Sequence, residues 1–183
     1  MATRITLLDR EDMSEEQKEA YDEIAAGPRG GVRGPLLLWL HSPKYARLAQ
    51  RVGETLRWHS TFGMRLTEFA ILITARHYSS DYVWHVHSKF GRDHGLEDDI
   101  IDDLAHRRRP TFSDPQTEAV YDFATEVLEK NHVSDSTLER VKGHFGERGA
   151  IELGAIIAHY HLGHITLSLA EMPLPEGATP LPA

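Results

Sequence analysis

The residues of this sequence best suited to chemistry are Glu68 and His87, which fall in successive predicted helices. Glu68 lies in an apolar helical segment, and His87 shares a helix face with Val83 and Phe90. A histidine beside an apolar wall can move a proton near neutral pH, and a nearby carboxylate would orient its ring. The spacing therefore predicts a general acid–base pair, although a buried structural pair between two helices has the same spacing.

A second group of polar rings occurs in segment 159–164, where Tyr160, His161 and His164 interrupt an apolar helical pattern. Buried polar groups need partners, and imidazole binds several divalent metals. One hypothesis is a metal site that combines His161 and His164 with His87 or Glu68. The chain has 12 histidines and no His-Glu-x-x-His motif. We therefore expect no metal and no cofactor, and keep these three residues as alternative proton donors or as supports for the main pair.

Arg65 and Arg76 flank Glu68 in the same predicted helix. A guanidinium matches the geometry of a carboxylate, so either arginine could bind an acidic substrate. A surface ion pair with a nearby Asp or Glu explains the same residues. Trp39 and Trp84 are candidates for the wall of a substrate pocket, although aromatic side chains at such positions also occur in ordinary cores.

The apolar spacing predicts an all-α fold, because helix-period patterns recur along the chain and no segment alternates with the period of a strand. A capping box begins the first helix at Ser14, and Ser-Pro and Asp-Pro pairs begin two others. We expect seven or eight helices. They span about residues 15–26, 43–60, 65–78, 82–94, 96–104, 115–130, 135–143 and 149–170.

The chain is expected to form one domain over residues 1–183, with an extended arm at 1–13 and a Pro-rich tail at 172–183. Segment 27–35 contains four glycines and two prolines, which exclude it from the interior of a helix or strand. It is either a solvated connector or a mobile lid.

The composition excludes several classes of function. The chain has no cysteine, so disulfides, iron–sulfur clusters and thiol catalysis are impossible. Its net charge is −8, which argues against binding to nucleic acid. No apolar run reaches the length of a membrane-spanning helix, and the first residues do not resemble a signal peptide. We expect a cytoplasmic protein that binds a small-molecule substrate, with no nucleic-acid or membrane partner.

Residues 65–96 contain a motif that reads Arg65-x-x-Glu68-x-x-Ile71-Leu72, then Tyr82-Val83-Trp84-x-x-His87, then Gly95-Leu96. This motif resembles the carboxymuconolactone decarboxylase family, which belongs with the alkylhydroperoxidase D-like (AhpD-like) proteins. The entry segment at 34–43 also fits. The resemblance implies an AhpD-like helical bundle built around a helical hairpin. It further implies homotrimers or homohexamers, with the sites close to the contacts between subunits.

The resemblance also shows where this chain departs from its relatives. The peroxidase branch uses a Glu, a Cys-x-x-Cys pair and a His. These positions fall on Glu68, on Ser80 and Val83, and on His87. Both thiols are absent, so thiol peroxidase activity is excluded. The decarboxylase branch commonly carries Tyr-Glu-Trp where this chain has Tyr82, Val83 and Trp84.

The function that the resemblance implies is a cofactor-independent lyase of aromatic catabolism. It would catalyse decarboxylation or proton transfer on a small carboxylated lactone or keto acid. In this hypothesis His87 is the general acid or base and Glu68 orients it. Arg65 or Arg76 would bind a carboxylate, and Tyr82, Trp84 and Trp39 would line the substrate pocket. The alternative is a non-catalytic oligomeric protein of the same fold that binds a small ligand or a metal.

Overall fold

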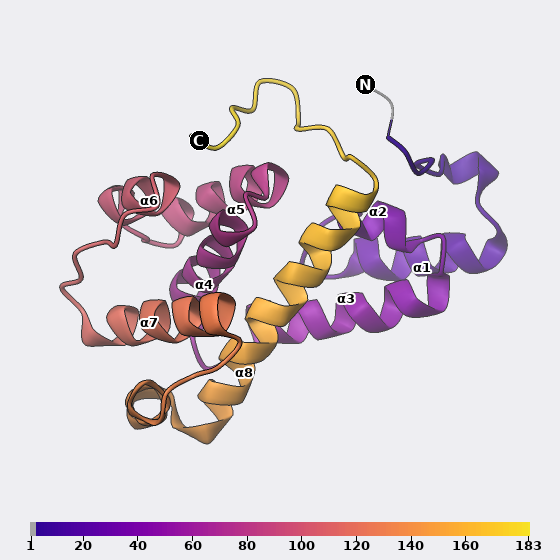
Figure 1. The fold of residues 1–183 in the computed structure, drawn as a ribbon. Helices are drawn as coiled ribbons and strands as arrows, with labels where there is room; N and C mark the ends of the chain where they lie inside the picture. The colour runs from indigo at the N-terminus through magenta and orange to yellow at the C-terminus, as the bar shows by residue number, and fades with distance from the viewer. Residues whose placement is uncertain (1–2) are drawn as a thin grey trace.

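The computed structural model describes residues 3–183. Figure 1 shows a bundle of helices. Eight α-helices and one short 3₁₀ turn, η1 (Arg10–Asp12), account for the regular structure of the described residues, which contain no strand. The helices are α1 (Glu15–Ala26), α2 (Pro35–Trp39), α3 (Pro43–Trp58), α4 (Gly63–His77), α5 (Asp81–Asp93), α6 (Asp98–Ala105), α7 (Pro115–Lys130) and α8 (Asp135–Leu169). The expected all-α architecture is confirmed.

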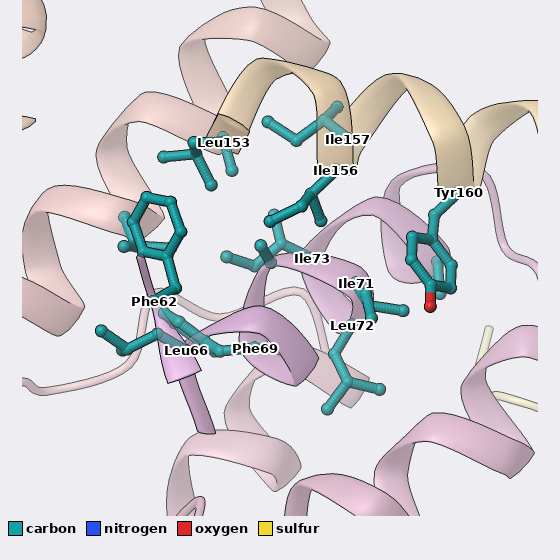
Figure 2. Packing of buried hydrophobic residues seen from close by; sticks show 14 of the residues in the cluster. Phe62, Leu66, Phe69, Ile71, Leu72, Ile73, Leu153, Ile156, Ile157 and Tyr160 are labelled. Atoms are coloured by element: carbon teal, nitrogen blue, oxygen red, sulfur yellow. The ribbon is translucent and has the colours of Figure 1, made fainter. Parts of the chain in front are cut away.

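Helix α4 is the centre of the bundle. Every residue from Leu66 to Arg76 is buried, and α4 packs against α3, α5, α6, α7 and α8. Figure 2 shows the apolar side chains of α4 facing those of α8, among them Ile73 and Ile156. A helix that is buried all round is rich in apolar residues, as this one is. Glu68 is therefore embedded in the main core.

A second, smaller core joins α1, α2 and α3 around Ile24, Trp39 and Leu40. Helix α8 packs against α2 and α3 of this part as well as against α4 and α7, and it runs between the two groups in Figure 1. The short apolar run after Pro35 forms α2, which begins at this proline and buries Leu36, Leu38 and Trp39. The junction of the two cores lies beside α5 and α8, where the candidate site is found.

The spacing of the apolar residues in α3 would predict that its larger apolar side chains are buried, but two of them lie on its exposed face. Leu48 and Val52 are 57% and 51% exposed, whereas the buried face carries small residues and two polar ones, Gln50 and Arg57. Apolar exposure on α3 and at Leu169 of α8 is compatible with contact between subunits. The homotrimer or homohexamer stays a prediction.

Residues close to both ends of the described chain form hydrogen bonds with the bundle. The backbone amide of Arg4 donates to the carbonyl of Ala170 at 2.8 Å. In the Pro-rich tail, the amide of Leu181 donates to Asp81 at 2.8 Å, and Arg76 donates to the carbonyl of Pro182 at 2.9 Å. Within the described part of the chain, no helix has both the length and the apolar composition needed to cross a membrane.

The two helices expected over 135–143 and 149–170 are joined in α8 through a sharp kink. Gly146 causes the kink, with φ 69° and ψ 179° inside an otherwise helical run. This conformation is accessible almost exclusively to glycine. The glycine therefore sets the direction in which the second half of α8, with Tyr160, crosses the bundle.

We predict that Gly146→Ala lowers the free energy of unfolding by about 1–3 kcal/mol, because an alanine must adopt a strained backbone conformation there. No atom lies within 4 Å of a Cβ placed at Gly146, so the cost would come from the backbone alone. Chemical denaturation measures it. Gly143→Ala is the matched control: its Cβ is equally unobstructed and its backbone is helical, so it should be neutral or stabilising. Equal effects of the two substitutions would contradict this account.

Candidate active site

The buried carboxylate of Glu68 joins three helices. His87 of α5 donates from Nδ1 to Glu68 Oε2 at 2.6 Å, and Arg57 of α3 donates from Nε to Glu68 Oε1 at 2.7 Å. Glu68 is 0% exposed and Arg57 is 5% exposed. The proximity of Glu68 and His87 expected from the sequence is therefore present, and each carboxylate oxygen has its own donor.

The charges of this group determine which nitrogen of His87 can react. Burial raises the pKa of Glu68, but His87 and Arg57 together outweigh burial and leave this pKa below its usual value. Burial lowers the pKa of His87, which Glu68 opposes only in part. At neutral pH an ionised Glu68 can only accept, so Nδ1 of a neutral His87 carries the proton. The lone pair of His87 then resides on Nε2, as a general base requires.

His87 opens onto a cavity of about 100 Å³ at the junction of the two cores. Helices α2, α3, α5 and α8 and the segment before α2 line it. Three arginines and two histidines contribute to its wall, and none of its lining residues is an Asp or Glu. The lining residues are Arg29, Gly31, Arg33, Gly34, Pro35, Leu36, Trp39, Arg57, Tyr82, Val83, Val86, His87, Phe90, His159, Tyr160, Gly163 and Leu167. A cavity with this charge favours an anionic ligand.

Two of the arginines come from segment 27–34. The guanidinium of Arg29 lies over the Trp58 ring, with its Cζ atom 5.1 Å from the ring centroid. A Cβ at Gly53 of α3 would lie 2.6 Å from Arg29 Nη2 and would also collide with His159. The lack of a side chain at Gly53 thus leaves room for both residues beside α3. Segment 27–34 therefore forms one wall of the cavity.

Arg57 is fixed by aromatic rings as well as by Glu68. Its Cζ atom lies 4.3 Å from the centroid of Phe90 and 4.6 Å from that of Trp58. Cations bind favourably over aromatic faces, and guanidinium is the group that does so most often in proteins. Arg57 is therefore a permanent positive charge held between Glu68 and the cavity.

The structure brings some of the sequence candidates together and leaves others apart. Trp39, Tyr82 and Tyr160 line the cavity with His87, whereas Trp84 is buried in the main core. His161 and His164 do not line the cavity: they stack on Tyr78, and the ring centroids of His161 and Tyr78 are 3.9 Å apart. Among residues 3–183, no group of three His, Asp or Glu side chains is arranged to hold a metal ion.

The two arginines singled out in the sequence are engaged elsewhere. Arg65 donates to Glu97 at 2.6 Å and to the carbonyl of Gly95 at 3.2 Å, which ties α4 to the start of α6. Arg76 bonds the C-terminal tail. Neither lines the cavity. Arg65 therefore forms a surface ion pair, as the alternative interpretation of its sequence position predicts, and Arg76 holds the C-terminal tail against α4.

Sequence reasoning missed Arg29, Arg33 and Arg57. Arg57 does carry a signal, because it lies one helical turn after Gly53 on the face of α3 that has Ala46 and Ala49. A charged residue in register with small residues that allow close helix packing indicates a buried charge. Arg29 and Arg33 lie in a glycine-rich segment, where no periodicity reveals which way a side chain points.

Three solved structures are similar to this chain along nearly its whole length. One is the AhpD core of an uncharacterized peroxidase-related protein from Ralstonia eutropha JMP134 (TM-score 0.79, 18% identity, 96% of this chain and 94% of that one). Another is a peroxidase-related protein from Silicibacter sp. TM1040 (0.77, 14%, 97% and 93%). The third is a variant of the debrominase Bmp8 in complex with 2,3,4-tribromopyrrole (0.76, 15%, 96% and 94%). The chain therefore has the AhpD-like fold, without any cysteine.

No protein-family model matches the sequence, and no curated protein is significantly similar to it. The similarity to the solved structures thus shows the fold alone.

We predict that Arg57→Gln lowers the free energy of unfolding at pH 7 by about 3–5 kcal/mol, because it leaves the buried charge of Glu68 without its cationic partner. Urea denaturation of both proteins measures the loss. Arg108→Gln is the control: Arg108 pairs with Asp102 and Asp103 at the surface, where such a pair contributes little to stability. A loss below 1 kcal/mol for Arg57→Gln would contradict the buried ion pair.

We also predict that the protein loses stability as the pH falls from 6.5 to 4. Burial, helped by Arg29, lowers the pKa of His159 to about 4, so the unfolded chain binds a proton there over this range and the folded protein does not. Each such proton reduces the free energy of unfolding by up to about 1.4 kcal/mol per pH unit. His159→Gln should therefore flatten the decline measured by denaturation at pH 7, 6 and 5. An unchanged slope would mean that His159 is not buried as a neutral ring.

Proposed function

We propose that this protein is an enzyme that transfers protons, without a cofactor, on a small carbonyl compound that carries a carboxylate. The observation that supports this proposal most directly is the buried chain Arg57–Glu68–His87, which ends at a cationic cavity. Such a chain of side chains can hold a neutral histidine so that one of its ring nitrogens is free to take a proton.

His87 is the base in this proposal. Its Nδ1–H donates to Glu68, which fixes the tautomer and the plane of the ring, and its Nε2 takes a proton from the carbon next to the substrate carbonyl. The developing positive charge on His87 is stabilised by the ionised Glu68 at 2.6 Å. Arg57 keeps Glu68 ionised throughout, so the proton stays on the histidine.

Arg29 and Arg33 are proposed to bind the substrate carboxylate, in place of Arg65 and Arg76. Guanidinium groups bind carboxylates through paired hydrogen bonds. The size of the cavity restricts the substrate to a small molecule. The debrominase of similar fold, which was crystallised with a bromopyrrole, supports the idea that this fold can hold a small ring.

Decarboxylation of a carboxylated lactone or a β-keto acid is the specific reaction that we propose to test first. In such a reaction the electron pair of the breaking carbon–carbon bond moves into the carbonyl group as carbon dioxide leaves, and the enolate carbon then takes a proton, which His87 would donate in its protonated form. The leaving carboxylate needs an apolar environment, because nearby cations stabilise the starting carboxylate. Val86 and Leu167 provide an apolar part of the cavity wall. A substrate with two acidic groups would place one at the arginines and the other at this wall.

We predict that His87→Gln lowers the rate of the reaction by about 10²–10⁴-fold, because it removes the positioned acid–base group while it keeps a side chain of similar length. Carbon dioxide release from carboxymuconolactone, other carboxylated lactones and β-keto acids measures decarboxylation. Exchange of α-hydrogen for deuterium in D₂O measures proton transfer. The wild-type rate of deuterium exchange should fall as the pH drops through the pKa of His87, which burial places below the usual 6.5.

His85→Gln is the control, because it makes the same change on the same helix outside the cavity. It should keep wild-type activity. Equal rates for wild type and His87→Gln would assign the proton transfer to another group. Tight binding of small carboxylates by the wild type, with no turnover in either assay, would instead favour the non-catalytic binding protein.

A further inference from the structure

The hydroxyl group of Tyr160 is unusual in its surroundings. Tyr160 is 8% exposed, and its hydroxyl oxygen is fully buried and makes no well-formed hydrogen bond among residues 3–183, although the guanidinium of Arg29 lies close enough to favour its phenolate. Buried hydroxyl groups are normally paired, because an unpaired one loses its hydrogen bonds to water without replacement. In Figure 2 the ring of Tyr160 extends from α8 at a distance from Leu153, Ile156 and Ile157, and the hydroxyl lies at the end of the ring that points away from α8. The core therefore does not use this hydroxyl.

The same residue borders the cavity next to His87. Tyr160 is among the lining residues, and its ring meets that of His87 edge to face, with centroids 5.0 Å apart and planes at 85°. Arg29 and Arg57 line the cavity with them. One cavity thus combines a proton acceptor, a proton donor and two fixed positive charges, and these come from four separate segments of the chain.

The protonation state of Tyr160 suits a donor. Burial raises its pKa, and the positive charges of Arg57 and Arg29 offset burial only in part. The phenol is therefore protonated at neutral pH. The two guanidinium groups would nevertheless stabilise the phenolate once the proton is given up or shared.

We propose that Tyr160 is the second catalytic residue of this site, the donor that binds and protonates the oxygen of an enolate formed from the substrate. This inference rests on the proposed function of His87. It narrows the substrate to a compound whose reacting carbon is next to a carbonyl group, because an oxygen must collect the negative charge where Tyr160 can reach it.

Groups within the site account for every proton and electron pair that the proposed step moves. His87 Nε2 takes the proton from the carbon, and the electron pair of the C–H bond forms a carbon–carbon double bond. The carbonyl π pair moves to oxygen, which receives the proton of Tyr160. In the return step the enol O–H gives its proton back to the phenolate while a carbon takes the proton from His87. No outside oxidant, reductant or cofactor is required.

The test uses binding, so that it does not depend on finding the natural substrate. Tetronic acid ionises to a planar lactone enolate, and 2-furoate is a carboxylate on a ring of similar size without an enolate oxygen. Titration calorimetry at pH 7 should show that Tyr160→Phe weakens tetronate binding by about tenfold or more, the effect of losing a hydrogen bond to a charged group. The affinity for 2-furoate should change less than threefold.

Two comparisons exclude a merely structural effect. Tyr160→Phe keeps the ring and removes an unpaired hydroxyl, so its stability should equal or exceed that of the wild type. Tyr121→Phe removes a hydroxyl from a residue of α7 outside this cavity, and tetronate binding should stay unchanged. On any substrate that the enzyme turns over, Tyr160→Phe should lower kcat with little change in KM, and the alkaline limb of the pH–rate profile should disappear.

The outcomes separate this inference from the proposal for His87. Equal tetronate affinity in wild type and Tyr160→Phe, or no tetronate binding by the wild type at 10 mM ligand, would overturn the role of Tyr160. Weakened tetronate binding together with full activity of His87→Gln would support Tyr160 and overturn the role of His87.

Discussion

The ionised carboxylate of Glu68 is the constraint on which the rest of this structure depends. It lies in the most buried helix of the bundle, where an unpaired charge would strongly destabilise the fold. Helix α3 must therefore bring Arg57 to one oxygen, and α5 must bring His87 to the other. The small residues of α3, the complete burial of α4 and the inward face of α5 are all required for these two contacts. The relative positions of three helices thus follow from one charge.

The same two residues border the cavity. Arg57 and His87 each bond one oxygen of Glu68, and both line the cavity. Segment 27–34 and the second half of α8 close this space, the first with arginines and the second with Tyr160 and His159. Gly53 and the kink at Gly146 are needed because close approach and a change of helix direction occur at these points. The same glycines therefore support both the fold and the candidate site.

Much of this could be predicted from the sequence, and the exceptions have a common cause. Helix periodicity and caps located every helix except α2, whose five residues are too few to show a period, and the spacing of Glu68 and His87 indicated two inward faces. Periodicity reports which face of a helix is apolar, so it could not show that Arg57 lies on the buried face of α3 while Leu48 and Val52 face outward. It gives no direction at all for Arg29 or Arg33. Arg65 and Arg76 were close to Glu68 in sequence, but the helix turns them towards the chain connections.

Stability alone does not account for the Arg57–Glu68–His87 chain. Replacing a buried ion pair by apolar side chains of similar volume is commonly neutral or stabilising, whereas removal of one partner is costly. A chain without cysteine also has no thiol for this carboxylate and histidine to serve. What the arrangement does provide is a histidine of fixed tautomer, kept neutral by burial and facing a cationic cavity. A bundle that needed only to be stable could fill positions 57, 68 and 87 with leucine; one that must take a proton from a small anion needs the charges that this protein buries.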